Sequence, residues 1–107
     1  MKKVVFLQSA RAELLELRRY LIAKFGAQSW LETRRTIEGA VAQIEAFPLK
    51  GHTPPELRDL GMTDYYQVIC GMNRIVYQVD GKVVYLHLIV DTRRDLKAVL
   101  AQRLFQL

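Results

Sequence analysis

The fold predicted from this sequence is decided by one stretch, Asp64-Tyr-Tyr-Gln-Val-Ile-Cys-Gly-Met-Asn-Arg-Ile-Val-Tyr-Gln-Val-Asp-Gly-Lys-Val-Val-Tyr-Leu-His-Leu-Ile-Val90. Apolar runs lie on both sides of Asp80-Gly81, a pair that favours a tight hairpin turn because both residues tolerate positive φ. The runs and the turn together predict three strands of an antiparallel meander. A basic segment, Asp91-Thr-Arg-Arg-Asp95, follows the last strand.

A two-residue loop at Asp80-Gly81 would fix which side chains share a face of the hairpin. One face, predicted to form the core, would pair Val79 with Lys82, Tyr77 with Val84 and Ile75 with Leu86. The other face, whose polarity indicates incomplete cover, would pair Gln78 with Val83, Val76 with Tyr85 and Arg74 with His87. Arg74 beside His87 would make a candidate anion site. In the alternative, Arg74 pairs with a nearby carboxylate and His87 is an ordinary half-buried strand residue.

The first half of the chain predicts a strand and a helical hairpin. Residues 3–8 read as a short strand, and Ser9 is placed to cap a helix that ends at about Lys24 or Phe25, before Gly26. Its predicted buried stripe is Ala10, Leu14, Leu17, Leu21 and Phe25. A capping box at Ser29 and Glu32 predicts a second helix that runs to Pro48. Its apolar positions are Trp30, which we expect to be a core anchor, Thr33, Ile37, Ala40 or Val41, Ile44 and Phe47.

The remaining segments complete an α+β domain. Residues 48–56 hold all three prolines and predict a loop, in which His52 is expected to be exposed. After the meander, Asp91 or Thr92 is placed to cap a final helix over residues 93–105, with leucines at Leu96, Leu100 and Leu104. The predicted order is β-α-α-β-β-β-α, with the helices on one face of a small antiparallel sheet. We expect one domain over residues 1–107.

Composition limits the classes of protein that fit. Half of the 107 residues are apolar, so a core needs no disulfide or metal to support it. Sixteen Lys and Arg against eleven Asp and Glu give a net charge of +5, which favours an acidic or polyanionic partner. The single cysteine, Cys70, fits a reducing compartment. With no signal-peptide pattern, metal-ligand spacing or cofactor motif, we expect a cytoplasmic protein without cofactor or membrane association.

Several motifs resemble the RelE/ParE superfamily of bacterial toxins. They are Glu56-Leu-Arg-Asp-Leu60, Tyr66, Asn73-Arg-Ile-Val-Tyr-Gln-Val79 and Leu88-Ile-Val-Asp-Thr-Arg-Arg-Asp-Leu96, preceded by the predicted helical hairpin. The resemblance covers nearly the whole chain. It implies a toxin of a type II toxin-antitoxin module of the plasmid-stabilisation type, which arrests growth and is neutralised by a cognate antitoxin that wraps around it.

The RelE branch of this superfamily implies ribosome-dependent cleavage of mRNA without metal. That chemistry needs a base, an acid and cations near the scissile phosphate. On the resemblance, Arg74 and Arg93 match the phosphate-contacting arginines, but Gln67 and Ile69 stand where lysines are expected and Val99 stands near an expected tyrosine. His87 could serve as acid or base because its ordinary pKa lies near neutrality, although the resemblance places no histidine there. The tyrosines Tyr65, Tyr66 and Tyr85 are further candidates for stacking or acid groups.

The ParE branch lacks the nuclease residues and acts on DNA gyrase through surfaces that include the C-terminal segment. The closing Arg93-Arg94-Asp95, followed by a leucine-bearing helix, resembles this branch, which we favour. RelE-like mRNA cleavage is the alternative, and an inactive module that binds only an antitoxin or a nucleic acid is the second. The predicted binding residues are Arg58, Arg74, Tyr85, Arg93, Arg94 and Lys97. We expect the antitoxin in a groove between the hairpin and the sheet, or over a basic face containing Arg58, Arg74 and Arg93.

Overall fold

The computed structural model describes residues 2–104 and confirms the predicted order of strands and helices, with one addition. The elements are β1 (Lys3–Phe6), α1 (Gln8–Phe25), α2 (Ala27–Ala46), α3 (Pro55–Arg58), β2 (Tyr65–Cys70), β3 (Asn73–Asp80), β4 (Val83–Asp91) and α4 (Leu96–Leu104). The short helix α3 begins in the segment predicted as a loop. Pro55 fits its first turn because a backbone N–H there has no partner within the helix, so the N–H that proline lacks is not needed.

The sheet is mixed rather than purely antiparallel. Its four strands lie in the order β1-β4-β3-β2, and the meander β2-β3-β4 is antiparallel as predicted. The first strand, β1, pairs with β4 in parallel, with Phe6 opposite Leu86. Parallel strands need a long connection, and the chain between β1 and β4, which includes the α1–α2 hairpin and strands β2 and β3, provides it. This leaves β1 and β2 as the two edge strands.

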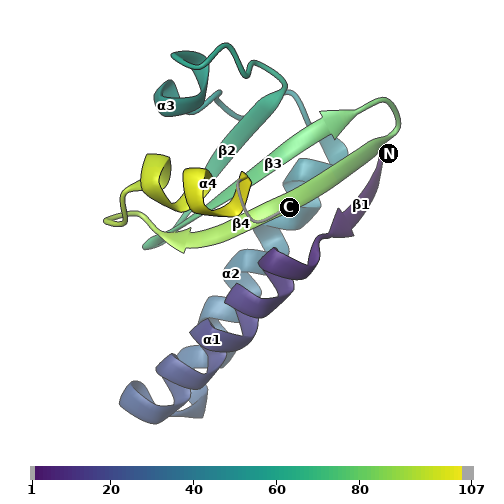
Figure 1. Ribbon diagram of the computed structural model, residues 1–107. Helices are drawn as coiled ribbons and strands as arrows, with labels where there is room; N and C mark the ends of the chain where they lie inside the picture. The colour runs from purple at the N-terminus through teal and green to yellow at the C-terminus, as the bar shows by residue number, and fades with distance from the viewer. Residues whose placement is uncertain (1, 105–107) are drawn as a thin grey trace.

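Helices cover both faces of the sheet, so the prediction of helices on one face was wrong. In Figure 1, α2 passes behind the strands and α1 runs beside it below them, while α4 crosses the front of the sheet and α3 lies beside β2. The core on the hairpin face includes Ala10, Ile37, Ile44, Ile75, Tyr77 and Leu86. The core on the other face is formed by Leu57, Tyr65, Val76, Leu88, Val90, Leu96 and Val99. Apolar residues on both faces of β3 and β4 are the sequence signal of this double cover.

The β3–β4 hairpin differs from the predicted register in two places. Its loop residues are Gly81 and Lys82, so Asp80 pairs with Val83 and Val79 with Val84. Gly81 has φ 59° at the first loop position, the arrangement of a type II′ turn, whereas the prediction placed Asp80 in the loop. The register then shifts by one residue, because Tyr77 pairs with Leu86 and Val76 with Leu88. His87 is therefore the extra residue of a β-bulge.

The bulge moves Arg74 away from His87. Arg74 pairs with Val90, so the predicted pair of Arg74 with His87 was wrong. Val90 is three residues along β4 from His87, a separation of roughly 10 Å at the usual strand rise. Both side chains still lie on the face covered by α3 and α4, as the predicted alternation required.

The predicted end of the first helix before Gly26 is confirmed, but the predicted side-chain caps at the helix N-termini were wrong. Gly26, at φ 96°, ends α1 by donating its N–H to the carbonyls of Leu21 and Ile22, and α2 begins at the next residue. Neither helix has a side-chain cap, so the capping box at Ser29 and Glu32 is not formed. The hydroxyl of Ser9 instead donates to the carbonyl of His87 at 2.8 Å.

The C-terminal helix begins later than predicted. Asp91 is the last residue of β4, and α4 starts at Leu96. Asp95 accepts a hydrogen bond from the backbone N–H of Ala98 at 3.3 Å and therefore caps the helix in place of Asp91 or Thr92. Leu96 is buried, while Phe105 lies outside the described residues and the side chains of Leu100 and Leu104 are not described.

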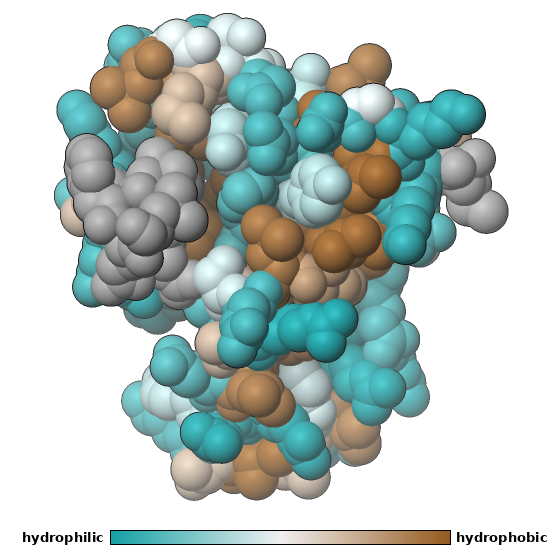
Figure 2. Space-filling view, turned by 45° about the vertical axis from the view of Figure 1, so that its right-hand side comes forward, coloured by the Kyte–Doolittle hydropathy of each residue, from teal (hydrophilic) through white to brown (hydrophobic). Residues whose placement is uncertain are grey.

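The hairpin extends beyond the sheet. Figure 1 shows the end of α1 and the start of α2 projecting below the strands, and Figure 2 shows this part as a narrower lobe with apolar surface among hydrophilic side chains. Phe25 and Tyr20 are exposed there, so Phe25 does not belong to the buried stripe, and Trp30 is half-buried rather than a core anchor. Within residues 2–104, no helix combines the length and the apolar character needed to cross a membrane.

Candidate functional site

Arg74 is held in place by three protein groups. Its Nη1 donates to Gln67 Oε1 at 3.2 Å and to Glu56 Oε2 at 3.4 Å, and its Nη2 donates to the carbonyl of Thr92 at 3.2 Å. The side chain is 16% exposed, and its Nε is buried without a partner among the described residues. Arg74 thus ties β3 to α3, β2 and the end of β4, which matches the alternative in which it pairs with a carboxylate.

His87 lies in a separate polar cluster. Its Nε2 is 3.1 Å from Gln78 Oε1, and Gln78 donates through Nε2 to Asp64 Oδ2 at 2.7 Å. Since the amide of Gln78 donates to the carboxylate, its oxygen accepts from His87, which places the imidazole proton on Nε2. Tyr65 packs on the ring at a centroid distance of 5.1 Å.

The electrostatics of this cluster favour a neutral imidazole. Burial lowers the pKa of His87 below its usual value, and the nearby carboxylate of Asp64 opposes this only in part. Burial also raises the pKa of Tyr65, with Asp64 adding to the shift. Tyr65 contacts His87 through its ring, and no described arginine hydrogen-bonds or pairs with this histidine.

Arg93 forms an ion pair with Asp91 at the end of β4. Its Nε and Nη2 donate to the two carboxylate oxygens, each at 2.9 Å, and its backbone N–H donates to Oδ1 at 2.8 Å. These hydrogen bonds lower the pKa of Asp91 to about 2. The Arg93 side chain is 77% exposed, so its charge remains open to solvent and to partners.

The predicted basic face is split across the sheet. Arg93 lines a hollow of about 500 Å³ between the hairpin and the ends of the strands, together with Tyr20, Lys24 and Phe25. Arg74, in contrast, faces α3 on the opposite side of the sheet, with Arg58 nearby on that helix. Arg58, Arg74 and Arg93 therefore do not share one surface, although Arg58 and Arg93 are both exposed.

The other predicted binding residues lie on β4, before α4 and in its first turn. Arg94 and Lys97 are exposed in the segment that leads into this helix and in its first turn. Tyr85 is half-buried and pairs with Gln78. Within the described ranges, no group of histidine, cysteine and acidic residues has the geometry of a metal site.

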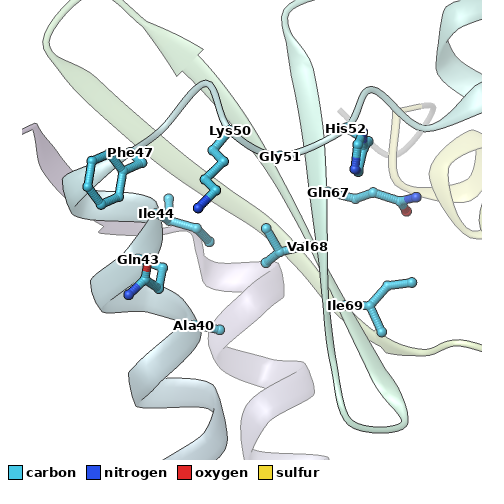
Figure 3. A pocket seen from close by; sticks show the side chains of 10 residues that line it. All are labelled: Ala40, Gln43, Ile44, Phe47, Lys50, Gly51, His52, Gln67, Val68 and Ile69. Carbon is cyan, nitrogen blue, oxygen red and sulfur yellow. The ribbon is translucent and has the colours of Figure 1, made fainter.

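An apolar groove lies along β2, between the hairpin helix α2 and the sheet, where a groove was expected although its lining residues were not predicted. It has a volume of about 420 Å³ and runs between the end of α2, the loop that follows it and the edge strand (Figure 3). Val68 and Ile44 form its floor, and Lys50 stands at its rim. The exposed Phe47 and Ile69, each with a large apolar side chain, were the available sequence signal.

Comparison with solved structures defines the class of fold. The chain superposes on one from the "Chromosomal ParDE TA system from P. aeruginosa" with a TM-score of 0.70 and 15% identity, covering 85% of this chain and 96% of that one. It also superposes on a chain of the toxin-antitoxin complex RelBE2 from Mycobacterium tuberculosis with a TM-score of 0.57 and 18% identity, covering 84% and 96%. The protein therefore has an α+β fold found in toxin-antitoxin structures.

The family follows from the sequence itself. The family model described as "ParE toxin of type II toxin-antitoxin system, parDE" matches residues 4–96, and the chain belongs to this family. A comparison with the curated proteins gives no match. The expected membership of the RelE/ParE superfamily is thus confirmed.

Proposed function

We propose that this ParE-type toxin arrests bacterial growth by acting on DNA gyrase and does not cleave RNA. The match to the ParE family over residues 4–96 carries this proposal. The exposed arginines of the segment between β4 and α4, Arg93 and Arg94, are the proposed contact residues. The charge of Arg93 remains available to a partner, because its ion pair with Asp91 is exposed to solvent and exposed pairs are weak.

Three features of the site count against the mRNA cleavage alternative. Gln67 and Ile69 stand where the resemblance to RelE expects lysines, and neither can donate a proton to a leaving group. The donors of Arg74 are directed at Gln67, Glu56 and Thr92, so a phosphate would have to displace them. Because of the bulge, Arg74 pairs with Val90, three residues along β4 from His87, so His87 lies outside hydrogen-bonding range of Arg74.

The proposed neutralising partner is a cognate antitoxin. The fold is shared with structures described as a ParDE system and as the RelBE2 toxin-antitoxin complex, which supports this partner. The hollow between the hairpin and the sheet is lined by Tyr20, Phe25 and two cations, Lys24 and Arg93, with Glu32 and Asp91 as opposite charges. An amphipathic segment would cover the aromatic side chains, and its acidic residues would be attracted by the net charge of +5 of the whole chain.

Pulse labelling of growing bacteria tests the target. After expression of the chain begins, thymidine incorporation should fall before methionine incorporation, with transcripts intact, and the purified chain should inhibit supercoiling by gyrase. Cleaved transcripts with an early fall in methionine incorporation would establish the RNA alternative. Normal growth with the full chain present would favour the inactive binding module.

A matched pair of double variants tests the proposed contact residues. Replacing Arg93 and Arg94 by alanine should relieve growth arrest and gyrase inhibition by about tenfold or more, the effect expected for charged anchors of an interface. The same change at Arg34 and Arg35, which are exposed on α2, removes equal charge and should leave both activities unchanged. Equal loss in the two variants would show that net charge alone matters.

A further inference from the structure

The side of α1 that faces away from the sheet carries a stripe of exposed side chains. Leu15 and Ile22 are seven residues apart, so they lie nearly in line along the helix, and the buried Ala10 and Glu13 lie on its opposite side. Leu15 is 51% exposed and Ile22 is 39% exposed. Three arginines flank this apolar pair. We call the stripe the outer face of α1, and its residues are Arg11, Leu15, Arg18, Arg19 and Ile22.

Two shallow hollows lie along the outer face of α1 and meet at Leu15. The lining of one, of about 500 Å³, includes Arg11 and Ala12, and the lining of the other, of about 430 Å³, includes Ile22 and Ala23. The alanines leave room between larger side chains, which is where the side chains of a second helix would insert. The spacing of two helical turns between Leu15 and Ile22 is also the repeat at which packed helices meet. The shape of this face therefore fits a helix.

The charge of the outer face of α1 is positive and uncompensated. None of its three arginines forms a salt bridge with a described carboxylate. Arg11 donates through Nε to the carbonyl of Phe6 at 3.3 Å, which ties it to β1 and leaves its other donors to solvent. Glu16 is exposed but lies about 100° around the helix from Leu15, at the margin of the face. The face thus has an apolar centre with cations on both flanks.

We propose that the outer face of α1 binds an acidic, amphipathic helix of a partner protein. The apolar side of that helix would cover Leu15 and Ile22, and its carboxylates would pair with the flanking arginines. Arginine beside an apolar centre is a composition typical of protein interfaces. This inference goes beyond the proposed function, because the hollow lined by Tyr20 and Lys24 lies on the opposite side of α1. The two sites can therefore be occupied at the same time.

Two other occupants fit the outer face of α1 less well. A second copy, packed antiparallel so that Leu15 meets Ile22, would set Arg18 opposite Arg19 and bring like charges together. A nucleic acid would satisfy the arginines through its phosphates but would leave Leu15 and Ile22 without an apolar partner. The combination of charge and apolar surface favours the acidic helix.

A peptide titration of the isolated full-length chain tests the proposal. The probe is a capped, hydrocarbon-stapled peptide of three heptads, with leucines along one side of the helix and glutamates on both flanks of that side. By backbone amide NMR, saturable shifts are expected over residues 11–23. A stapled peptide of the same composition, with its leucines spread around the helix, should bind about tenfold more weakly, because it cannot cover Leu15 and Ile22 together.

Several results would overturn the proposal. Equal affinity of the two peptides would mean that charge alone attracts them, and shifts confined to the hollow beside Arg93 or to the groove along β2 would place the binding elsewhere. Tighter binding of a duplex DNA to residues 11–23 at physiological salt would assign the face to a nucleic acid. Shifts over the same residues that depend on the concentration of the chain alone would assign it to a second copy.

Two double variants separate the apolar contact from the charges. Replacing Leu15 and Ile22 by alanine keeps good helix formers on α1 and should weaken the peptide by about tenfold, because apolar surface no longer becomes buried. Replacing Arg18 and Arg19 by glutamate should abolish binding of the glutamate peptide and allow binding of one with lysine in its place. Circular dichroism checks that each variant is folded.

The same change of charge elsewhere on the hairpin is the matched control. Replacing Arg34 and Arg35, which are exposed on α2, by glutamate should leave the affinity of the glutamate peptide within about twofold of the original. An equal loss in this variant and in the variant of Arg18 and Arg19 would show that net charge is responsible and would overturn the proposal. Because the titration involves no gyrase and no cells, its result is independent of the growth and supercoiling experiments.

Discussion

At the scale of single residues, Arg74 illustrates how a functional and a structural role compete for the same side chain. An arginine on a sheet face predicts anion binding, but its donors here are directed at Gln67, Glu56 and the Thr92 carbonyl. The sequence allowed the carboxylate alternative without identifying Glu56, because that residue lies on α3, a helix that the prolines concealed. Loss of activity in an Arg74 variant would therefore have to be separated from loss of stability.

His87 makes a prediction about pH at the same scale. Its pKa is lowered in the folded protein by burial, while in the unfolded chain it titrates near 6.5. Between these two values the unfolded chain binds more protons, so the free energy of unfolding should fall as the pH drops below about 6.5. The slope is at most about 1.4 kcal/mol per pH unit for one proton. Above that pH the contribution is constant.

Urea unfolding at a series of pH values from about 7.5 to 5 measures this effect. His87→Gln should flatten the dependence, and His52→Gln, at an exposed position, is the matched control for the loss of a histidine. The ion pair of Asp91 does not interfere, because a pKa of about 2 places its loss of stability at a lower pH. An unchanged slope in His87→Gln would show that another group titrates in this range.

At the scale of elements, the faces of the strands could be predicted from the sequence but their register could not. Alternation correctly placed Tyr77 and Val84 on the core face and Gln78 and Tyr85 on the other. The bulge at His87 depends on contacts from α1, which has no local sequence signal. Its Ser9 hydroxyl donates to the carbonyl of His87, and the buried carboxylate of Glu13 accepts from the N–H of Ile89 at 3.1 Å.

The reason for these contacts is the end of β1. This strand pairs with β4 only as far as Leu86, after which the chain turns into α1 and the backbone of β4 loses its neighbour. Side chains of α1 then satisfy the exposed polar groups, as buried backbone requires. To predict the bulge, one would need to know how α1 packs against β4, and this tertiary contact cannot be read from the local sequence.

At the scale of elements, we expect the substitution of glycine by alanine to have opposite effects on stability at Gly51 and Gly39. In Gly51→Ala the new Cβ would meet the Tyr77 hydroxyl and the Gln67 carbonyl, so the variant should lose about 1–3 kcal/mol of stability. Gly39 lies in α2 with nothing within 4 Å of a Cβ, so Gly39→Ala should gain about 0.5–1 kcal/mol from helix propensity. Denaturant unfolding followed by circular dichroism compares the two. Equal signs would contradict the close approach of the loop to β2.

At the scale of the whole molecule, one sheet separates two apolar cores, and its strands are shared by both. Ile75 and Leu86 belong to the core beneath the hairpin, while Val76 and Leu88 belong to the core beneath α3 and α4. A side chain lost from either core weakens the packing of the same β3–β4 pair. We therefore expect the two layers to unfold together, as small domains usually do.

The buried thiol of Cys70 reports on this coupling, because it lies in the core beneath the hairpin and burial raises its pKa, which reduces the reactive thiolate. Leu57→Ala alters the opposite core and should cost about 2–5 kcal/mol. If the layers open together, labelling of Cys70 by a thiol reagent under native conditions should accelerate about thirtyfold or more, since each 1.4 kcal/mol is about a factor of ten. Leu15→Ala, at an exposed position on α1, should change the rate little. Destabilisation by Leu57→Ala without faster labelling would mean that α3 and α4 unfold while the hairpin and the sheet stay closed.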